Sequence, residues 1–254
     1  MHRAFNITNC KWDNPSETGS AIFTRNSDDI RKSLEPFVTG QIVDGTKLTN
    51  HWFPVKKADV FISHSHADKE QAIRCAGWLK NVFGLEPFID SCVWGHAAEL
   101  LKIIDTEYCK ITNTEMFDYE KRNDSTSHVH MMLSTALAAM LDATECVMFI
   151  NTRNSITSKE SIAKTQSPWL SLELGTMRII RRRQPDRKGQ IRNFTNESKE
   201  VIKASRFIAE YEVPLSELTT LTTSEMNTWK KAHEGSIHSQ HPLDLLYDMA
   251  PEQD

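Results

Sequence analysis

One glutamate, Glu173, lies in a segment where none of its helical neighbours is a cation. On a helix, residues three and four positions apart lie beside each other, which places Trp169 and Leu170 on one side and Thr176 and Met177 on the other. This pattern allows a functional carboxylate that is held in a cleft with Trp169 one turn away. The pattern equally allows a partly exposed glutamate at the edge of a core helix.

Further side chains that can bind a ligand follow two short apolar runs. Serine and histidine follow the run 60–62, an aspartate follows the run 88–89, and a tryptophan that can stack on a flat ring lies just beyond it. Each also has an ordinary alternative, because serine, histidine and aspartate cap loops and tryptophan packs between subunits. These candidates are Ser63, Ser65, His66, Asp90 and Trp94.

The elements that position these residues alternate between strands and helices. A β-branched and aromatic run, then helical spacing that ends at Gly84, then a second short run predict a βαβ unit with parallel strands and a right-handed crossover. Ser167 and Pro168 indicate the start of a later helix, as N-cap and first helical residue. The expected order is strand 60–62, helix 69–83, strand 88–89, helix 97–108, loop 110–127, helix 128–143, strand 146–150, helix 168–181 and strand 207–213.

This alternation predicts an α/β fold with a central parallel sheet flanked by helices. Ligands bind such sheets outside the carboxyl ends of the strands, where 63–66, 90–94 and 151–153 are polar. Three parts are expected along the chain. They are a polar, turn-rich N-terminal extension at 1–56, the α/β domain at 57–213, and a C-terminal tail at 214–254 that packs back on the domain.

Composition excludes several classes of protein. The 254 residues carry a net charge of −4, which argues against bulk attraction to nucleic acid or anionic lipid. No run of about 18 apolar residues predicts a membrane span, and neither glycine-rich phosphate loop occurs. Five widely spaced cysteines, with no CxxC pair, favour a reduced cytoplasmic location without disulfides. The pairs His64/His66 and His128/His130 lack further ligands at metal-site spacing, so no metal is expected.

Three segments together resemble the Toll/interleukin-1 receptor (TIR) domain. They are 59–65, which ends its apolar run in Phe-Ile-Ser, 88–90, which reads Phe-Ile-Asp, and 167–173, where Trp169 precedes Glu173 by four residues. In the family, the second strand leads into the BB loop and the third helix carries a Trp-Cys-x-x-Glu motif. Leu170 replaces the motif cysteine here. The resemblance covers about 57–213, while 1–56, the tail and the long insertion at 97–143 have no counterpart, and no fifth strand is evident.

The resemblance implies a flavodoxin-like TIR fold and two possible activities. Some family members are adaptors that only self-associate, and others are enzymes that cleave NAD with the motif glutamate, here Glu173. The layout looks like the stand-alone, Thoeris-like bacterial members, in which phage infection triggers NAD depletion or a cyclised ADP-ribose signal. The implied partners are NAD as substrate without a further cofactor, a second copy of the chain, and a downstream effector reached through the nucleotide signal. Ser63, Ser65 and His66 match the loop that contacts the nucleotide, and Trp169 would shape the pocket.

One carboxylate is chemically sufficient for this reaction. The nicotinamide nitrogen of NAD is already cationic and leaves as a neutral base, so no general acid is needed, in contrast to ordinary glycoside hydrolysis. A basic run that includes Arg182 and Arg183 could bind the phosphates, or could simply be a solvated helix end.

Two other functions remain open from the sequence. A non-catalytic interaction module would assemble through the BB-loop region 91–98, and Leu170 and the bulky Trp94 favour it. A nucleoside deoxyribosyltransferase or another N-glycosidic enzyme on a related sheet would cleave a free nucleoside instead of NAD.

Overall fold

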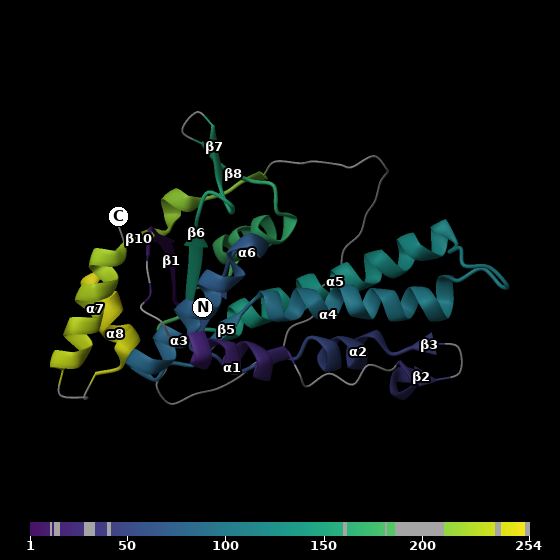
Figure 1. The fold of residues 1–254 in the computed structure, drawn as a ribbon, viewed down its shortest axis with the longest axis horizontal. Helices are drawn as coiled ribbons and strands as arrows, with labels where there is room; N and C mark the ends of the chain where they lie inside the picture. Colours follow the sequence, from purple (N-terminus) through teal and green to yellow (C-terminus); the bar gives the residue numbers. More distant parts are fainter. Residues whose placement is uncertain are drawn as a thin grey trace.

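The computed structural model of the chain is an α/β protein built on a five-stranded parallel sheet (Figure 1). It describes all residues except 11, 13–15, 28–33, 40–41, 160–161, 181, 186–210, 237–239 and 252–254. The spatial order of the strands is β10-β1-β6-β4-β5, and every neighbouring pair is parallel. The strands are β1 (Arg3–Thr8), β4 (Val60–Ser63), β5 (Pro87–Ile89), β6 (Cys146–Asn151) and β10 (Thr219–Leu221).

The predicted α/β class with a central parallel sheet is confirmed. The strands β4, β5 and β6 follow one another along the sequence and lie in the order second, first, third, which is how a flavodoxin-like sheet begins. The two remaining positions are filled by β1 and β10, one from each end of the chain.

Side chains of the strands alternate between two apolar clusters, one on each face of the sheet. Phe61 packs into the first cluster and its neighbours Val60 and Ile62 pack into the second. The same alternation runs along β6, where Val147 faces the first cluster and Met148 the second. A strand that is buried on both faces reads as a continuous apolar run, and this is why the sequence indicated β4 and β6 so clearly.

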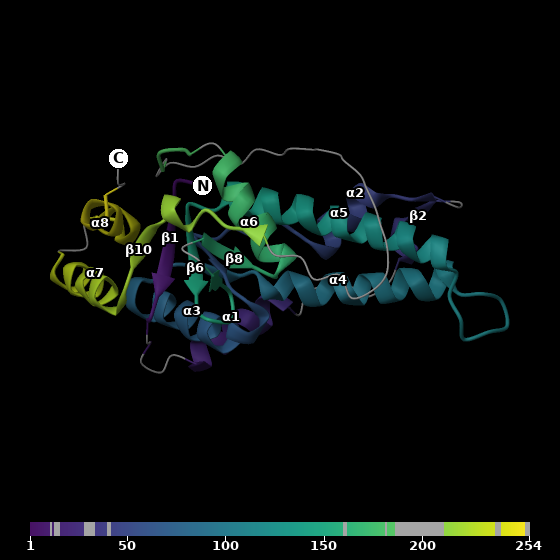
Figure 2. The ribbon, with the colours of Figure 1, turned by 90° about the horizontal axis from the view of Figure 1, so that it is seen from above.

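The helices divide between the two faces. The first cluster is covered by α2 (Gly45–Trp52), α4 (Ser91–Ile104), α5 (Tyr119–Ala143) and α6 (Pro168–Ile179). The second is covered by α1 (Ser16–Ser27), α3 (Lys69–Phe83), α7 (Thr223–Gly235) and α8 (Pro242–Met249). In both views α4 and α5 run side by side away from the sheet, while α7 and α8 lie at the opposite end of the molecule (Figures 1 and 2).

Smaller elements complete the chain. A hairpin of β2 (Val38–Thr39) and β3 (Ile42–Val43) precedes α2, and β7 (Thr157–Lys159), β8 (Ile162–Thr165) and β9 (Tyr211–Glu212) form a separate antiparallel sheet. Single turns lie at η1 (Glu35–Phe37), η2 (His66–Asp68) and η4 (Leu215–Glu217), and the π-helical turn η3 (Asp105–Cys109) ends α4. Among the described residues, no helix has the length and apolar character that a membrane crossing requires.

The expected strand at 207–213 is wrong as a strand of the main sheet. Its described part, β9, pairs antiparallel with β8, and residues 207–210 lie outside the described part of the chain. The fourth and fifth strands come instead from segments 3–8 and 219–221, which the sequence analysis assigned to an extension and a tail. These strands are polar as well as apolar: Arg3 donates to Thr219 at 3.1 Å and Asn6 to Thr220 at 3.3 Å, so no apolar run marks them.

The expected BB loop at 91–98 is also wrong in conformation. Helix α4 begins at Ser91, directly after β5 and six residues before the expected helix start at 97. The polar loop predicted at 110–127 is shorter than expected, because α5 begins at Tyr119, where the side chain of Asp118 caps it by accepting from the N–H of Lys121. Residues 119–127 are mostly polar, and tertiary contacts add to their helical structure, since Arg122 and Ser125 both donate to the side chain of Asp105 in η3.

A close approach of α1 to α3 depends on Gly19. A Cβ atom at this position would lie 1.9 Å from the backbone oxygen of Ile73, so one helix must shift to admit it. We expect Gly19→Ala to lower the free energy of unfolding by about 1–3 kcal/mol, as overpacked substitutions do. Urea denaturation measures this. Gly95→Ala in α4 is the matched control, since nothing lies within 4 Å of its Cβ position, and it should stabilise by up to about 1 kcal/mol.

Candidate functional site

The carboxyl ends of β4 and β6 meet at the point where the sheet changes its winding direction. The chain leaves β4 toward β5 on one side, and β6 lies on the other side of β4. In open α/β sheets such a point forms the crevice in which ligands bind. Polar residues from the loops after β4, β5 and β6 gather here, as expected from the sequence.

Glu173 reaches this edge from the second turn of α6. The helix begins as predicted: Ser167 is the N-cap and accepts from the N–H of Leu170 at 3.3 Å, and Pro168 is the first helical residue. Leu170 and Leu174 anchor the helix in the apolar cluster on that face of the sheet. Leu170 is therefore a core residue.

Glu173 is completely buried and bonded to the end of β4. Its side chain is 0% exposed, and its Oε2 atom accepts a hydrogen bond of 2.5 Å from the hydroxyl of Ser63. Its Oε1 atom is buried and accepts no hydrogen bond from an N–H or O–H group of the described residues. The hydrogen bond from Ser63 thus holds one carboxylate oxygen of Glu173 in place.

Asp90, at the end of β5, lies between Glu173 and a histidine. The Nδ1 atom of His64 is 2.5 Å from Oδ1 of Asp90, and both side chains are fully buried. The backbone N–H of His64 donates to the other carboxylate oxygen at 3.2 Å. His64 and Asp90 are therefore in direct contact through both backbone and side chain.

The surroundings of Glu173 favour its neutral form. Burial raises the pKa of Glu173 well above its ordinary value, because desolvation penalises the charged carboxylate. The nearby charge of Asp90 and a hydrogen bond between the two carboxyl groups raise this pKa further, while the hydrogen bond from Ser63 lowers it. A strongly raised pKa in a polar cluster at a sheet edge is typical of functional sites.

A third buried carboxylate, Asp68, ties two loops together beside this cluster. It accepts hydrogen bonds from Ser65 at 2.5 Å, from Thr152 at 2.6 Å and from the side-chain amide of Asn154 at 2.9 Å. The loop after β4 is thereby fixed to the loop after β6. Asp68 is the N-cap residue of α3, but its side chain makes no cap hydrogen bond to that helix.

The structure separates the sequence candidates into three groups. Ser63, Asp90 and Glu173 lie together, and Ser65 belongs to the neighbouring Asp68 cluster. His66 is exposed on η2 and takes part in none of the hydrogen bonds described above for Glu173 and Asp68. Trp169 is half-buried one turn before Glu173 and meets the ring of His130 edge-on, with centroids 5.4 Å apart. Trp94 lies in α4, and its side chain is outside the described part of the structure.

Sequence reasoning missed four members of these clusters: His64, Asp68, Thr152 and Asn154. His64 was weighed only as a metal ligand, although its place between two candidate serines at a strand end was a usable signal. Of the basic run, Arg183 pairs with Asp142 at 2.7 Å and so does not extend toward the site.

The side chain of Glu173 has no exposed surface in the described part of the chain. Two surface hollows found among the described residues lie elsewhere, one within the loop 110–115 and one lined by Arg25, Lys56 and Glu86, among others. Glu173 lines neither of them. A ligand can therefore reach Glu173 only after the polar edge of the sheet opens.

Burial of Glu173 makes stability depend on pH. The pKa of Glu173 is 4.5, its ordinary value, in the unfolded chain and higher in the folded chain. Above pH 4.5 the unfolded chain therefore loses this proton while the folded chain keeps it, and the free energy of unfolding falls as pH rises. Since one pH unit corresponds to about 1.4 kcal/mol, the loss by pH 7 is at most about 3 kcal/mol. We expect Glu173→Gln to remove this loss.

Urea denaturation at pH 5 and pH 7.5 measures the effect. The gain in unfolding free energy of Glu173→Gln over the parent chain should be larger at pH 7.5. An equal difference at the two pH values would show that the carboxyl is not desolvated in the folded chain.

Comparisons of this chain with protein-family models, with curated proteins and with solved structures return no match.

Proposed function

We propose that the chain cleaves the N-glycosidic bond of NAD, as an NAD glycohydrolase or an ADP-ribosyl cyclase, with Glu173 stabilising the ribosyl cation. The observation that carries this proposal is the buried Glu173, fixed by Ser63 at the carboxyl edge of the sheet, with its Oε1 atom bonded to no N–H or O–H group of the described residues. The TIR-like segments that suggested the reaction converge at this edge, which supports the same assignment.

The electrostatics of the cluster agree with a cationic substrate. Burial and Asp90 favour a protonated Glu173, and the positive nicotinamide ring of NAD would shift this group back to its charged form, since an opposite charge nearby lowers a carboxyl pKa. The proton thus leaves Glu173 when substrate arrives. The ionised group is then in a dry environment, in which it stabilises a developing cation more strongly than it would in water.

Self-association belongs to the proposal. Glu173 has no exposed surface in the single chain, so catalysis requires an event that opens the edge of the sheet. In the family that the sequence resembles, assembly of copies completes the active site, and we propose the same here, in a cytoplasmic defence role with a nucleotide signal to a downstream effector.

The test is incubation of the full chain with NAD over a wide range of protein concentrations. Chromatography follows nicotinamide release, and mass spectrometry distinguishes linear from cyclic ADP-ribose. Release that rises more steeply than protein concentration would support catalysis by an assembled form. Absence of release at every concentration would contradict the proposal.

One observation favours a non-catalytic interaction module as a second candidate. The complete burial of Glu173 is also what a purely structural residue would show. The segment 91–98, from which such a module would assemble, is the first part of α4, with Gly95 and Ala98 exposed. The effect of Glu173→Gln on nicotinamide release separates the two functions. A free nucleoside offered in parallel with NAD tests the deoxyribosyltransferase alternative.

A further inference from the structure

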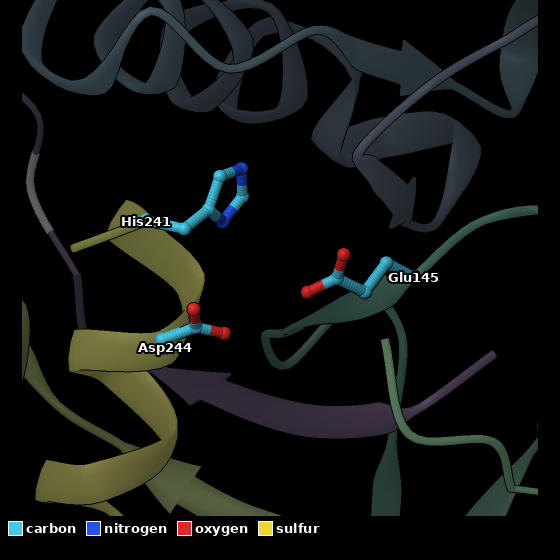
Figure 3. Close-up of side chains that lie close together, drawn as sticks. All are labelled: Glu145, His241 and Asp244. Carbon is cyan, nitrogen blue, oxygen red and sulfur yellow. The ribbon is translucent and has the colours of Figure 1, made fainter. Parts of the chain in front are cut away.

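We propose that Glu145, His241 and Asp244 form a binding site for a divalent transition metal ion of the zinc class. One potential donor atom from each residue lies within 4.8 Å of the others. Figure 3 shows the three side chains pointing toward a common space: Asp244 comes from α8, His241 from the N-cap position just before α8, and Glu145 from the residue just before β6. No spacing in the sequence joins them, because 96 or more positions separate Glu145 from the other two.

The donor set suits such an ion. Zinc accepts imidazole nitrogen and carboxylate oxygen at about 2.0–2.2 Å, which places tetrahedral ligands roughly 3.5 Å apart. Side-chain movements of about 1 Å would bring the present donors to that separation. Three protein ligands leave the fourth position to water.

The local bonds prepare two of the ligands. The hydroxyl of Tyr247 donates to Oε1 of Glu145 at 3.0 Å and so orients this carboxylate, as second-shell groups do in metal sites. The Nδ1 atom of His241 accepts from the N–H of Leu243 at 3.3 Å. An accepting nitrogen carries no proton, which is the state that a metal ligand requires. On metal binding, the Nδ1 atom of His241 would give up this long hydrogen bond from Leu243 and coordinate the ion instead.

The charges of the site also favour a cation. Two carboxyl groups and an imidazole meet in a half-buried position, where the attraction of carboxylates for a dication is screened less than at the surface. The amino group of Met1 lies near enough to Glu145 to feel its charge, and Arg3 bonds to Ala250 beyond the end of α8. A bound dication would add a direct link between α8 and the start of β6.

The site is separate from the Glu173 cluster. Glu145 precedes the amino end of β6, whereas Glu173 lies at the carboxyl edge of the sheet. Metal binding therefore has its own readouts, and its failure would leave the proposed NAD cleavage untouched.

Calorimetric titration of the chelator-treated full chain with zinc chloride tests the proposal. We expect one ion per chain, and a melting temperature that rises with zinc because the ion binds only the folded arrangement. His241→Asn keeps a good N-cap residue but removes the imidazole, and it should weaken binding by at least about tenfold. It should also abolish the zinc-dependent rise in melting temperature.

Two further variants complete the experiment. Asp244→Asn should weaken binding to a similar extent, which protects the result against poor folding of a single variant. His128→Ala, an exposed histidine on α5, should bind zinc as the parent chain does. The proposal is overturned if the parent chain binds no stoichiometric zinc, or if His241→Asn and Asp244→Asn both bind it with unchanged affinity.

Discussion

Glu173→Gln should reduce nicotinamide release from NAD by about a thousandfold. At about 4 Å and an effective dielectric constant near 20, one charge pair contributes roughly 4 kcal/mol, and each ~1.4 kcal/mol is tenfold in rate. Glutamine preserves the volume of the side chain and can still accept from Ser63, but it carries no charge. Initial rates of nicotinamide release, normalised to folded protein, give the measurement.

The matched control is Glu120→Gln, which makes the same chemical change at an exposed position on α5. It should leave the rate within about twofold. Because Glu173→Gln is expected to raise stability at neutral pH, lost activity in this variant could not be blamed on unfolding. Full activity in Glu173→Gln would remove the glutamate from the mechanism and with it the reason for proposing this reaction.

Trp229→Ala should be the most destabilising of the substitutions considered, at about 3–5 kcal/mol. The indole is fully buried. It stacks on Phe83 with ring centroids 3.8 Å apart, meets Trp78 edge-on, and donates from Nε1 to the backbone oxygen of Pro242 at 2.8 Å. Alanine would leave a cavity between α3, α7 and α8, and would release the start of α8.

Thermal unfolding should show this as a fall in melting temperature of roughly 10 °C, given about 2–4 °C per kcal/mol for a chain of this size. Trp229→Phe keeps an aromatic ring in the stack and should lose less than half as much. Tyr119→Ala, at a position that is 62% exposed, should change little. A Trp229→Ala melting temperature within about 2 °C of the parent would mean that α7 and α8 do not depend on this contact.

The sequence predicted the centre of the sheet well. Strands β4, β5 and β6 and helix α3 are buried on both faces or strongly amphipathic, so composition and period alone reveal them. The start of α6 was predicted equally well, because Ser167 and Pro168 are specific signals for a helix N-terminus. These local signals predicted that Glu173 lies on a helix near the ends of the strands.

Other elements could not be read locally. Strand β1 joins the sheet through β6 and β10, partners from distant parts of the chain, and its Arg3 and Asn6 are satisfied only by threonines of β10. The conformation of 91–98 likewise depended on packing, since the family resemblance suggested a loop and the structure has helix α4.

Residue type and spacing by themselves determined which side chains could do chemistry and on which kind of element each one lies, because secondary structure follows largely from patterns over a few residues. Only the tertiary structure decided which of them meet. It placed Glu173 on Ser63 and near Asp90, gave Asp90 the partner His64, and brought Glu145 to His241. The degree of burial, and with it the direction of the pKa of Glu173, depends on contacts between distant segments, which no local pattern contains.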